Sequence, residues 1–295
     1  MRFDDVSSNA SLGVRELEVE GERELLSARL YCVGPARSKR DSLIVFFHAG
    51  SFIAGGLEES DAFLRELTLS NPYHLILAIG YTLAQVRPFP AAVEDAYAVL
   101  KWTSKNRSGL RWTGKYLLVA GIEAGANLAA VSAMMARDRN GPHVAGQILI
   151  MPMLDPGLNS ESMRALPLRP EQTSVAEVCA DGYRNYLPRV SDRCHPYASP
   201  LHSSRLKHLP PTLILSAQDD PLRDEAEQYG IKLINSGVRT TVRRIPAPNS
   251  SLAKPCTRNS SACAAIVQAE IVAFIEWLMM KPNNVGPKVN IARLL

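Results

Sequence analysis

Residues 116–130, YLLVAGIEAGANLAA, constrain the fold of this chain more than any other segment. An apolar run leads into Gly121, Glu123 and Gly125, and small residues and Leu follow. Glycines two positions before and two positions after a central residue let a strand reverse sharply into a helix, because no Cβ atoms clash in the turn. The pattern therefore predicts a strand, a tight turn with Glu123 at its strained corner, and a helix.

The rest of the chain alternates between strand-like and helix-like segments. This order is typical of a mostly parallel sheet with helices on both faces, and apolar runs such as 42–47, SLIVFF, suit strands that are buried on both sides. Two β-rich pieces at 14–19 and 24–33 are expected to form an antiparallel edge. Further strands are expected at 42–47, 74–79, 146–151, 211–217 and 240–245, and helices at 58–69, 91–105, 127–136, 223–236 and 261–280. We expect an α/β fold with an eight-stranded sheet.

One segment interrupts the alternation. Residues 155–200 are rich in Pro, Ser and Arg and contain one predicted helix at 173–186. We interpret 155–200 as a lid inserted over the carboxyl edge of the sheet, within a single domain that spans 1–295. Residues 281–295 show no clear pattern and are interpreted as a C-terminal tail.

Charge and composition exclude several classes of protein. The net charge is +4, and acidic and basic residues are well mixed, so no nucleic-acid partner is expected. No window approaches the ~18 apolar residues of a membrane span, and the N-terminus has no apolar signal region. The five cysteines form no C-x-x-C pair, which favours free thiols in a reducing cytoplasm. We expect a cytoplasmic protein without cofactor or metal.

Five motifs occur in an order and spacing that resemble the hormone-sensitive-lipase-like carboxylesterases of the α/β-hydrolase superfamily. They are HAGSF at 48–52, YTLAQVRPFPAAVEDAYAVLKW at 81–102, GIEAGANLAA at 121–130, LPPTLILSAQDDPLRDEAEQYGIKL at 209–233 and VRRIPAPNSSL at 242–252. The resemblance extends from about residue 29 to residue 278. It implies an α/β-hydrolase fold with an inserted helical lid.

The resemblance also implies a catalytic triad, two of whose positions are substituted here. Glu123 stands at the nucleophile position, Ser250 at the base position and Asp220 at the position of the triad acid. His48 and Phe52 belong to the loop beside the pocket. A serine hydrolase needs a hydroxyl nucleophile and an imidazole, so we expect a catalytically inactive member that binds a small apolar or ester-like ligand, or a protein partner.

Glu123 is nearly isosteric with an acylated serine. Its Cβ, Cγ and carboxylate carbon follow the order of Cβ, Oγ and acyl carbon. The resemblance implies an oxyanion hole formed by the amides of Gly50, Ser51 and Ala124, and the helix N-terminus at Ala124 favours an anion. We therefore expect the carboxylate to occupy its own oxyanion hole.

Other classes of function stay open. Relatives of this fold that dehalogenate or open epoxides carry Asp at the same corner. Glu123 is therefore also a candidate nucleophile or general base of a hydrolase, lyase or cyclase acting on a small ester-like or epoxide-like substrate. A third class is a structural partner protein with a vestigial pocket, and strand 240–245 at a sheet edge is a candidate homodimer contact.

Overall fold

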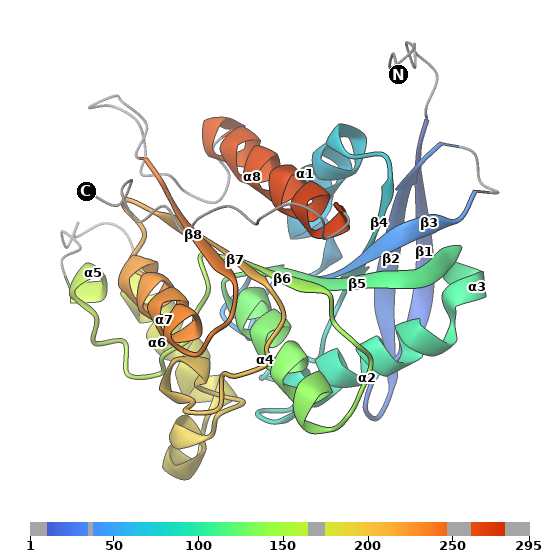
Figure 1. Ribbon diagram of the computed structural model, residues 1–295. Coiled ribbons are helices and arrows are strands. Elements are labelled where there is room, and N and C mark those ends of the chain that lie inside the picture. Colours follow the sequence, from blue (N-terminus) through green and yellow to red (C-terminus); the bar gives the residue numbers. More distant parts are fainter. Residues whose placement is uncertain (1–10, 35–37, 165–174, 247–260, 281–295) are drawn as a thin grey trace.

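The computed structural model describes residues 11–34, 38–164, 175–246 and 261–280. Within these ranges the strands form one eight-stranded sheet in the order β1-β2-β4-β3-β5-β6-β7-β8 (Figure 1). The strands are β1 (Leu12–Glu20), β2 (Leu25–Val33), β3 (Arg40–Phe47), β4 (His74–Ile79), β5 (Trp112–Ile122), β6 (Gly146–Ile150), β7 (Thr212–Ala217) and β8 (Thr240–Ile245). Strand β2 is antiparallel to both neighbours, and the other pairs are parallel. The predicted fold class is confirmed.

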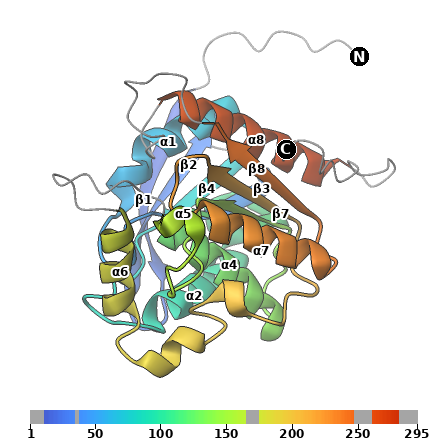
Figure 2. The ribbon, with the colours of Figure 1, turned by 90° about the vertical axis from the view of Figure 1, so that its left-hand side faces the viewer.

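Helices cover both faces of the sheet, as the two ribbon views show (Figures 1 and 2). One face carries α1 (Leu57–Ser70) and α8 (Ser261–Met279), and the other carries α2 (Ala91–Lys105), α4 (Ala124–Asp138) and α7 (Arg223–Asn235). The shorter helices are α3 (Arg107–Leu110), α5 (Glu161–Arg164) and α6 (Val175–Tyr186), with 3₁₀ turns at Val190–Cys194 and Pro200–His202. Within the described ranges, no helix is long and apolar enough to cross a bilayer.

Strand β3 needs a continuous apolar sequence because helices cover both of its faces. Leu43, Val45 and Phe47 join the hydrophobic core under α2 and α4. Ile44 and Phe46 point the other way, into the core under α1 and α8. Because successive side chains of a strand face opposite sides, both faces of this central strand are apolar.

The carboxyl ends of the parallel strands bring together the loops that the family motifs identify. The loop after β3 and the turn after β5 meet at this edge, where helix α6 lies against the first of them. A Cβ added to Gly182 of α6 would lie 2.3 Å from the carbonyl oxygen of Ser51. The helix predicted at 173–186 is present as α6 from Val175, while 165–174 and the tail 281–295 lie outside the described residues. The sequence did not predict α3, α5 or the 3₁₀ turns, which are too short to show a periodic pattern.

Candidate active site

Glu123 occupies a sharp turn between β5 and α4. Its backbone has φ 56° and ψ −112°, a strained conformation for a residue with a side chain. A Cβ added to Gly121 would lie 2.2 Å from the carbonyl oxygen of Gly125. A Cβ added to Gly125 would lie 2.1 Å from the carbonyl oxygen of Phe47. The amide of Glu123 donates to the carbonyl of Ile150 at 3.0 Å. The predicted strand–turn–helix is confirmed, and its close contacts explain both glycines.

The loop after β3 is curled tightly, so that successive amides face the turn. Gly50, Ser51 and Phe52 have φ values of 132°, 52° and 66°. The amides of Ile53 and Ala54 donate back to the carbonyl of Gly50 at 3.0 and 2.9 Å. Two residues that carry side chains therefore hold a left-handed backbone here, which costs about 1–2 kcal/mol each relative to glycine.

The carboxylate of Glu123 lies against this loop and is fully buried. Its Oε2 accepts hydrogen bonds from the amides of Gly50, at 2.9 Å, and Ser51, at 3.3 Å. Its Oε1 accepts a hydrogen bond from the hydroxyl of Ser51 at 2.7 Å. The carboxylate thus faces the two loop amides, as the sequence predicted, and Ala124 opens helix α4 directly behind it. That these three amides form an oxyanion hole stays a prediction.

The hydroxyl of Ser51 is a contact that the sequence reasoning missed. The available signal was Ser51 itself, which replaces a glycine of the family pattern at a position where glycine is favoured. A side chain that is retained at such a position needs a compensating interaction, and the bond to Glu123 provides one.

His48 stabilises the loop after β3 through its ring contacts. Its Nδ1 donates to the carbonyl of Ala49 at 2.7 Å, and its ring stacks on Tyr81 with centroids 4.2 Å apart. The hydroxyl of Tyr81 donates to the carbonyl of His48 at 3.1 Å. Burial lowers the pKa of His48, against weaker opposing effects of its hydrogen bond to the backbone of Ala49 and of the charges of Glu59 and Glu123. His48 is therefore held in a neutral form that supports the loop, and its predicted role at the pocket stays untested.

Phe52 joins the loop to α6 through an aromatic cluster. Its ring stacks on Tyr186 at 3.8 Å between centroids and tilts against Tyr183 at 5.9 Å. All three side chains are buried, and burial raises the pKa of both tyrosines. In the described part of the chain, neither phenolic oxygen has a hydrogen-bond partner. Two polar atoms are thus buried directly above the loop.

Of the two remaining triad positions, the structure describes Asp220 but not Ser250. Asp220 follows β7 and is half-buried, and its Oδ1 accepts a hydrogen bond from the amide of Leu222 at 2.8 Å, which shapes the turn into α7. Ser250 lies outside the described residues. The catalytic assignments of both stay predictions.

Glu225, in the same motif as Asp220, was not singled out from the sequence. It is buried, and its Oε1 accepts a hydrogen bond from the amide of Leu154 at 2.6 Å. Burial raises its pKa well above the ordinary value. Glu225 therefore ties the segment after β6 to helix α7, a supporting role that motif spacing alone does not reveal.

The described residues form no metal site, and neither of two surface cavities reaches the turn. Among the described residues, no group of three or more His, Cys, Asp or Glu side chains is arranged to hold a metal ion. A surface cavity of about 470 Å³ is lined by residues 207–209, 211 and 236–239. A second cavity, of about 350 Å³, is lined by residues 15–18, 102, 106, 109 and 110. Neither lining includes a predicted site residue.

Comparisons with known proteins agree with this fold. A family model described as the alpha/beta hydrolase fold matches residues 44–249. An arylesterase from Saccharolobus solfataricus is 31% identical over 233 residues, which cover 78% of this chain and 74% of that protein. Esterase LipI from Mycobacterium tuberculosis is 29% identical over 234 residues, covering 78% and 72%.

Solved structures give the same result. A hyperthermophilic esterase from the archaeon Pyrobaculum calidifontis superposes with a TM-score of 0.78 at 34% identity, covering 89% of this chain and 86% of that one. The thermostable carboxylesterase EstE1, cloned from a metagenomic library, has a TM-score of 0.78 at 30% identity, covering 91% and 90%. The chain therefore belongs to the α/β-hydrolase fold family. Within that family it is a homologue of the hormone-sensitive-lipase-like carboxylesterases, as its five motifs predicted.

Proposed function

We propose that this chain is a catalytically inactive member of its esterase family, in which the carboxylate of Glu123 fills the oxyanion hole. The observation that carries the proposal is the pair of hydrogen bonds from the amides of Gly50 and Ser51 to Oε2. In an esterase, such amides stabilise the negative oxygen that develops on the substrate. Here they already donate to a buried carboxylate, so an ester carbonyl has to displace a charged group before it can bind.

The substituted triad supports the same proposal. Without a serine and a histidine at positions 123 and 250, only the amides and the pocket remain to accelerate hydrolysis. Such remnants provide about 10³- to 10⁴-fold acceleration over water, far below a working esterase. With Oε2 of Glu123 bonded to the amides of Gly50 and Ser51, even this remnant is suppressed.

We assign the retained scaffold a binding role. The aromatic contact between Phe52 and α6 is the candidate site for a small apolar or ester-like ligand, which has to part the ring of Phe52 from that of Tyr186 to enter. The phenolic oxygens of Tyr183 and Tyr186, which have no hydrogen-bond partner among the described residues, support this role, because each buried unsatisfied group costs about 1–3 kcal/mol that a ligand atom can recover. A protein partner, or a second copy at the edge strand β8, is the alternative occupant, and a cytoplasmic location is part of the same proposal.

A carboxylate-based enzyme is the second candidate function. In that mechanism one oxygen of the acid is held by amides while the other attacks the substrate or removes a proton. The division of contacts at Glu123 favours this candidate, because both loop amides donate to the same oxygen, Oε2. However, Oε1 accepts a hydrogen bond from the hydroxyl of Ser51 at 2.7 Å, so this hydroxyl has to rotate away before Oε1 can react.

Restoring the two family residues tests the assignment. A variant with Glu123→Ser and Ser250→His is expected to hydrolyse p-nitrophenyl butyrate, while neither single change suffices, because the two groups act as a unit. The matched control combines Glu123→Ser with Ser251→His, which moves the imidazole by one residue. Equal rates for the double variant and this control would contradict the proposed positions.

A further inference from the structure

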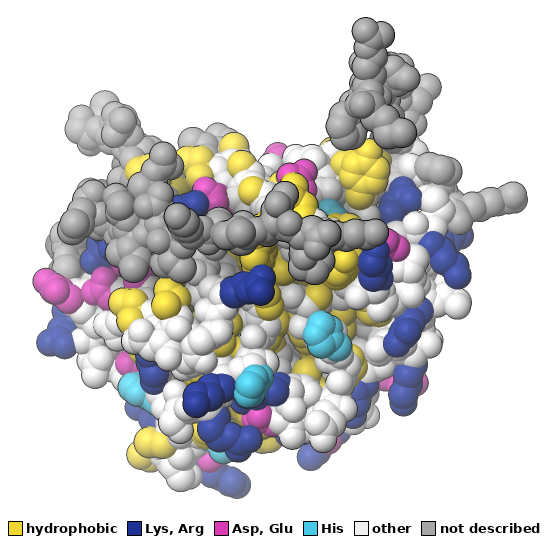
Figure 3. All heavy atoms as spheres, viewed as in Figure 1, with side chains coloured by type: hydrophobic (Ala, Val, Ile, Leu, Met, Phe, Trp, Pro, Cys, Tyr) yellow, Lys and Arg dark blue, Asp and Glu magenta, His cyan; other side chains and the backbone are white. Residues whose placement is uncertain are grey.

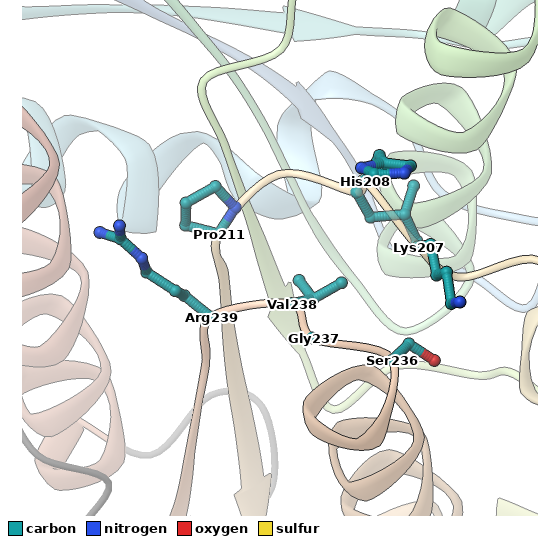
Figure 4. A pocket seen from close by; sticks show the side chains of 8 residues that line it. Lys207, His208, Pro211, Ser236, Gly237, Val238 and Arg239 are labelled. Atoms are coloured by element: carbon teal, nitrogen blue, oxygen red, sulfur yellow. The ribbon is translucent and has the colours of Figure 1, made fainter.

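The larger cavity lies far from the turn at Glu123. It has a volume of about 470 Å³ and lies between the loop before β7, at Lys207–Pro211, and the connection from α7 to β8, at Ser236–Arg239 (Figure 4). Strands β7 and β8 begin here, at Thr212 and Thr240, whereas the turn at Glu123 follows the carboxyl end of β5. The cavity is therefore at the opposite edge of the sheet, and its size suits a small ligand.

The cavity combines a basic rim with an apolar floor. Among the described residues that line it are Lys207, His208 and Arg239, and no Asp or Glu. Leu209 and Val238 are buried beneath them. The close-up shows Arg239 on the side of α8 and His208 on the side of α4, with the floor between them (Figure 4). On the same face of the molecule, Lys, Arg and His side chains surround a hollowed strip of apolar atoms (Figure 3).

Neighbouring contacts hold this rim in place. The guanidinium of Arg239 lies 6.0 Å from the ring centroid of Trp277. The carbonyl of Lys207 accepts a hydrogen bond from Nη1 of Arg137 at 2.9 Å, which fixes the loop. The nearby carboxylate of Asp138 is matched by Arg137, at 2.8 Å, and by Arg205, at 3.3 Å. Its charge therefore does not offset that of the rim.

The end of helix α7 does not oppose an anion strongly. The last carbonyls of a helix carry partial negative charge. Here the amides of Ser236, Gly237 and Val238 donate to the carbonyls of Lys232, Ile234 and Leu233 at 2.9–3.0 Å. Because these carbonyls are already hydrogen-bonded, they present less negative potential to the cavity.

We propose that this cavity binds amphipathic organic anions, namely carboxylates or phosphate monoesters that carry an apolar chain. The charged group meets Lys207, His208 and Arg239, and the chain lies on Leu209, Pro211 and Val238. Each exposed charge contributes little alone. The charges of Lys207 and Arg239, with the imidazole of His208 as a further hydrogen-bonding group, raise the local concentration of an anion around the apolar floor and orient it.

Calorimetric titration of the full chain tests this site with four probes: octanoate, octyl phosphate, acetate and 1-octanol. Octanoate and octyl phosphate are expected to bind, and acetate and octanol at least about tenfold more weakly, because each lacks one half of the recognised chemistry. Octanoate that binds no better than acetate, or no better than octanol, would overturn the proposal.

Variants locate the binding. The pair Lys207→Gln with Arg239→Gln is expected to raise the Kd of octanoate about tenfold, while the matched pair Lys101→Gln with Arg15→Gln, on another surface, leaves it within about twofold. An unchanged Kd in the first pair, or a Kd that rises equally in both pairs, would refute the assignment.

Discussion

The hydroxyl of Ser51 and the carboxylate of Glu123 lie 2.7 Å apart in a buried hydrogen bond, although the two residues are 72 positions apart in the chain. Both depart from the family pattern, in which a glycine and a serine stand at these positions. Ser51 has φ 52°, so its side chain costs backbone strain that a glycine avoids. The bond to Glu123 offsets this strain, which indicates that the two substitutions depend on each other.

This dependence predicts that the effect of Ser51→Gly on the free energy of unfolding changes sign when Glu123 is replaced. In the wild-type background, Ser51→Gly is expected to lower the free energy of unfolding by about 1–2 kcal/mol, because the lost bond to a charged group outweighs the relieved strain. In the Glu123→Ala background, the same change is expected to raise it by about 0.5–1 kcal/mol, because the relieved strain of about 1–2 kcal/mol exceeds the cost of glycine's greater freedom in the unfolded chain. Urea denaturation of the four proteins measures the coupling.

A control separates strain from coupling. Arg111 also has a left-handed backbone, at φ 57°, and lies on the surface away from the turn. Arg111→Gly should change stability equally in both backgrounds. Equal effects of Ser51→Gly in the two backgrounds would show that the two substitutions are independent.

The packing of α6 on the loop gives a second prediction. Gly182→Ala places a Cβ 2.3 Å from the carbonyl oxygen of Ser51, so α6 has to move away from the loop. Overpacking of this kind costs about 1–3 kcal/mol, and limited proteolysis near α6 should become faster. Gly109→Ala is the matched control, since nothing lies within 4 Å of its added Cβ. Equal stability and protease resistance of the two variants would contradict the close contact.

Burial of His74 predicts a pH dependence of stability. Burial lowers the pKa of His74 to about 4 from an ordinary 6.5. The unfolded chain therefore takes up this proton at a higher pH than the native protein. The free energy of unfolding should fall as pH decreases from about 6.5 to about 4, by up to about 3 kcal/mol from this residue, and the contribution should be constant below that.

The variant His74→Gln isolates this effect. The free energy of unfolding of this variant should fall by less than that of the wild type over the same pH range. Urea denaturation of both proteins at each pH measures the difference. Other titrating groups, including the buried Glu225, are common to both proteins and cancel in the difference. The exposed His143→Gln serves as the control, and a His74→Gln curve parallel to that of the wild type would contradict the prediction.

The sheet was predictable because its signals are local. Apolar runs such as 42–47 mark buried strands, and the glycines at 121 and 125 mark a turn in which a Cβ has no room. The direction of the Glu123 carboxylate followed from the chain length of its side chain and the position of the loop amides. These features depend on few residues and tolerate few alternatives.

The remaining features depend on contacts between distant segments. The hydroxyl of Ser51 reaches Glu123 only because the loop after β3 is curled, which spacing does not reveal. Glu225 and Gly182 act through the backbone of Leu154 and Ser51, respectively, and a single sequence does not show which carbonyl or amide a side chain will meet. The cavity near Arg239 is formed by two connections at the opposite edge of the sheet, where only the first residues of the motif at 209–233 reach.

Hydrolysis of p-nitrophenyl butyrate by the purified wild-type protein and by its Glu123→Ala variant is the decisive measurement. A filled oxyanion hole and a substituted triad predict no turnover by the wild type above that of a heat-denatured sample. The variant, with the hole emptied but no nucleophile, should gain at most a small rate. Turnover by the wild type that Glu123→Ala abolishes would contradict the inactive assignment and identify Glu123 as a catalytic carboxylate.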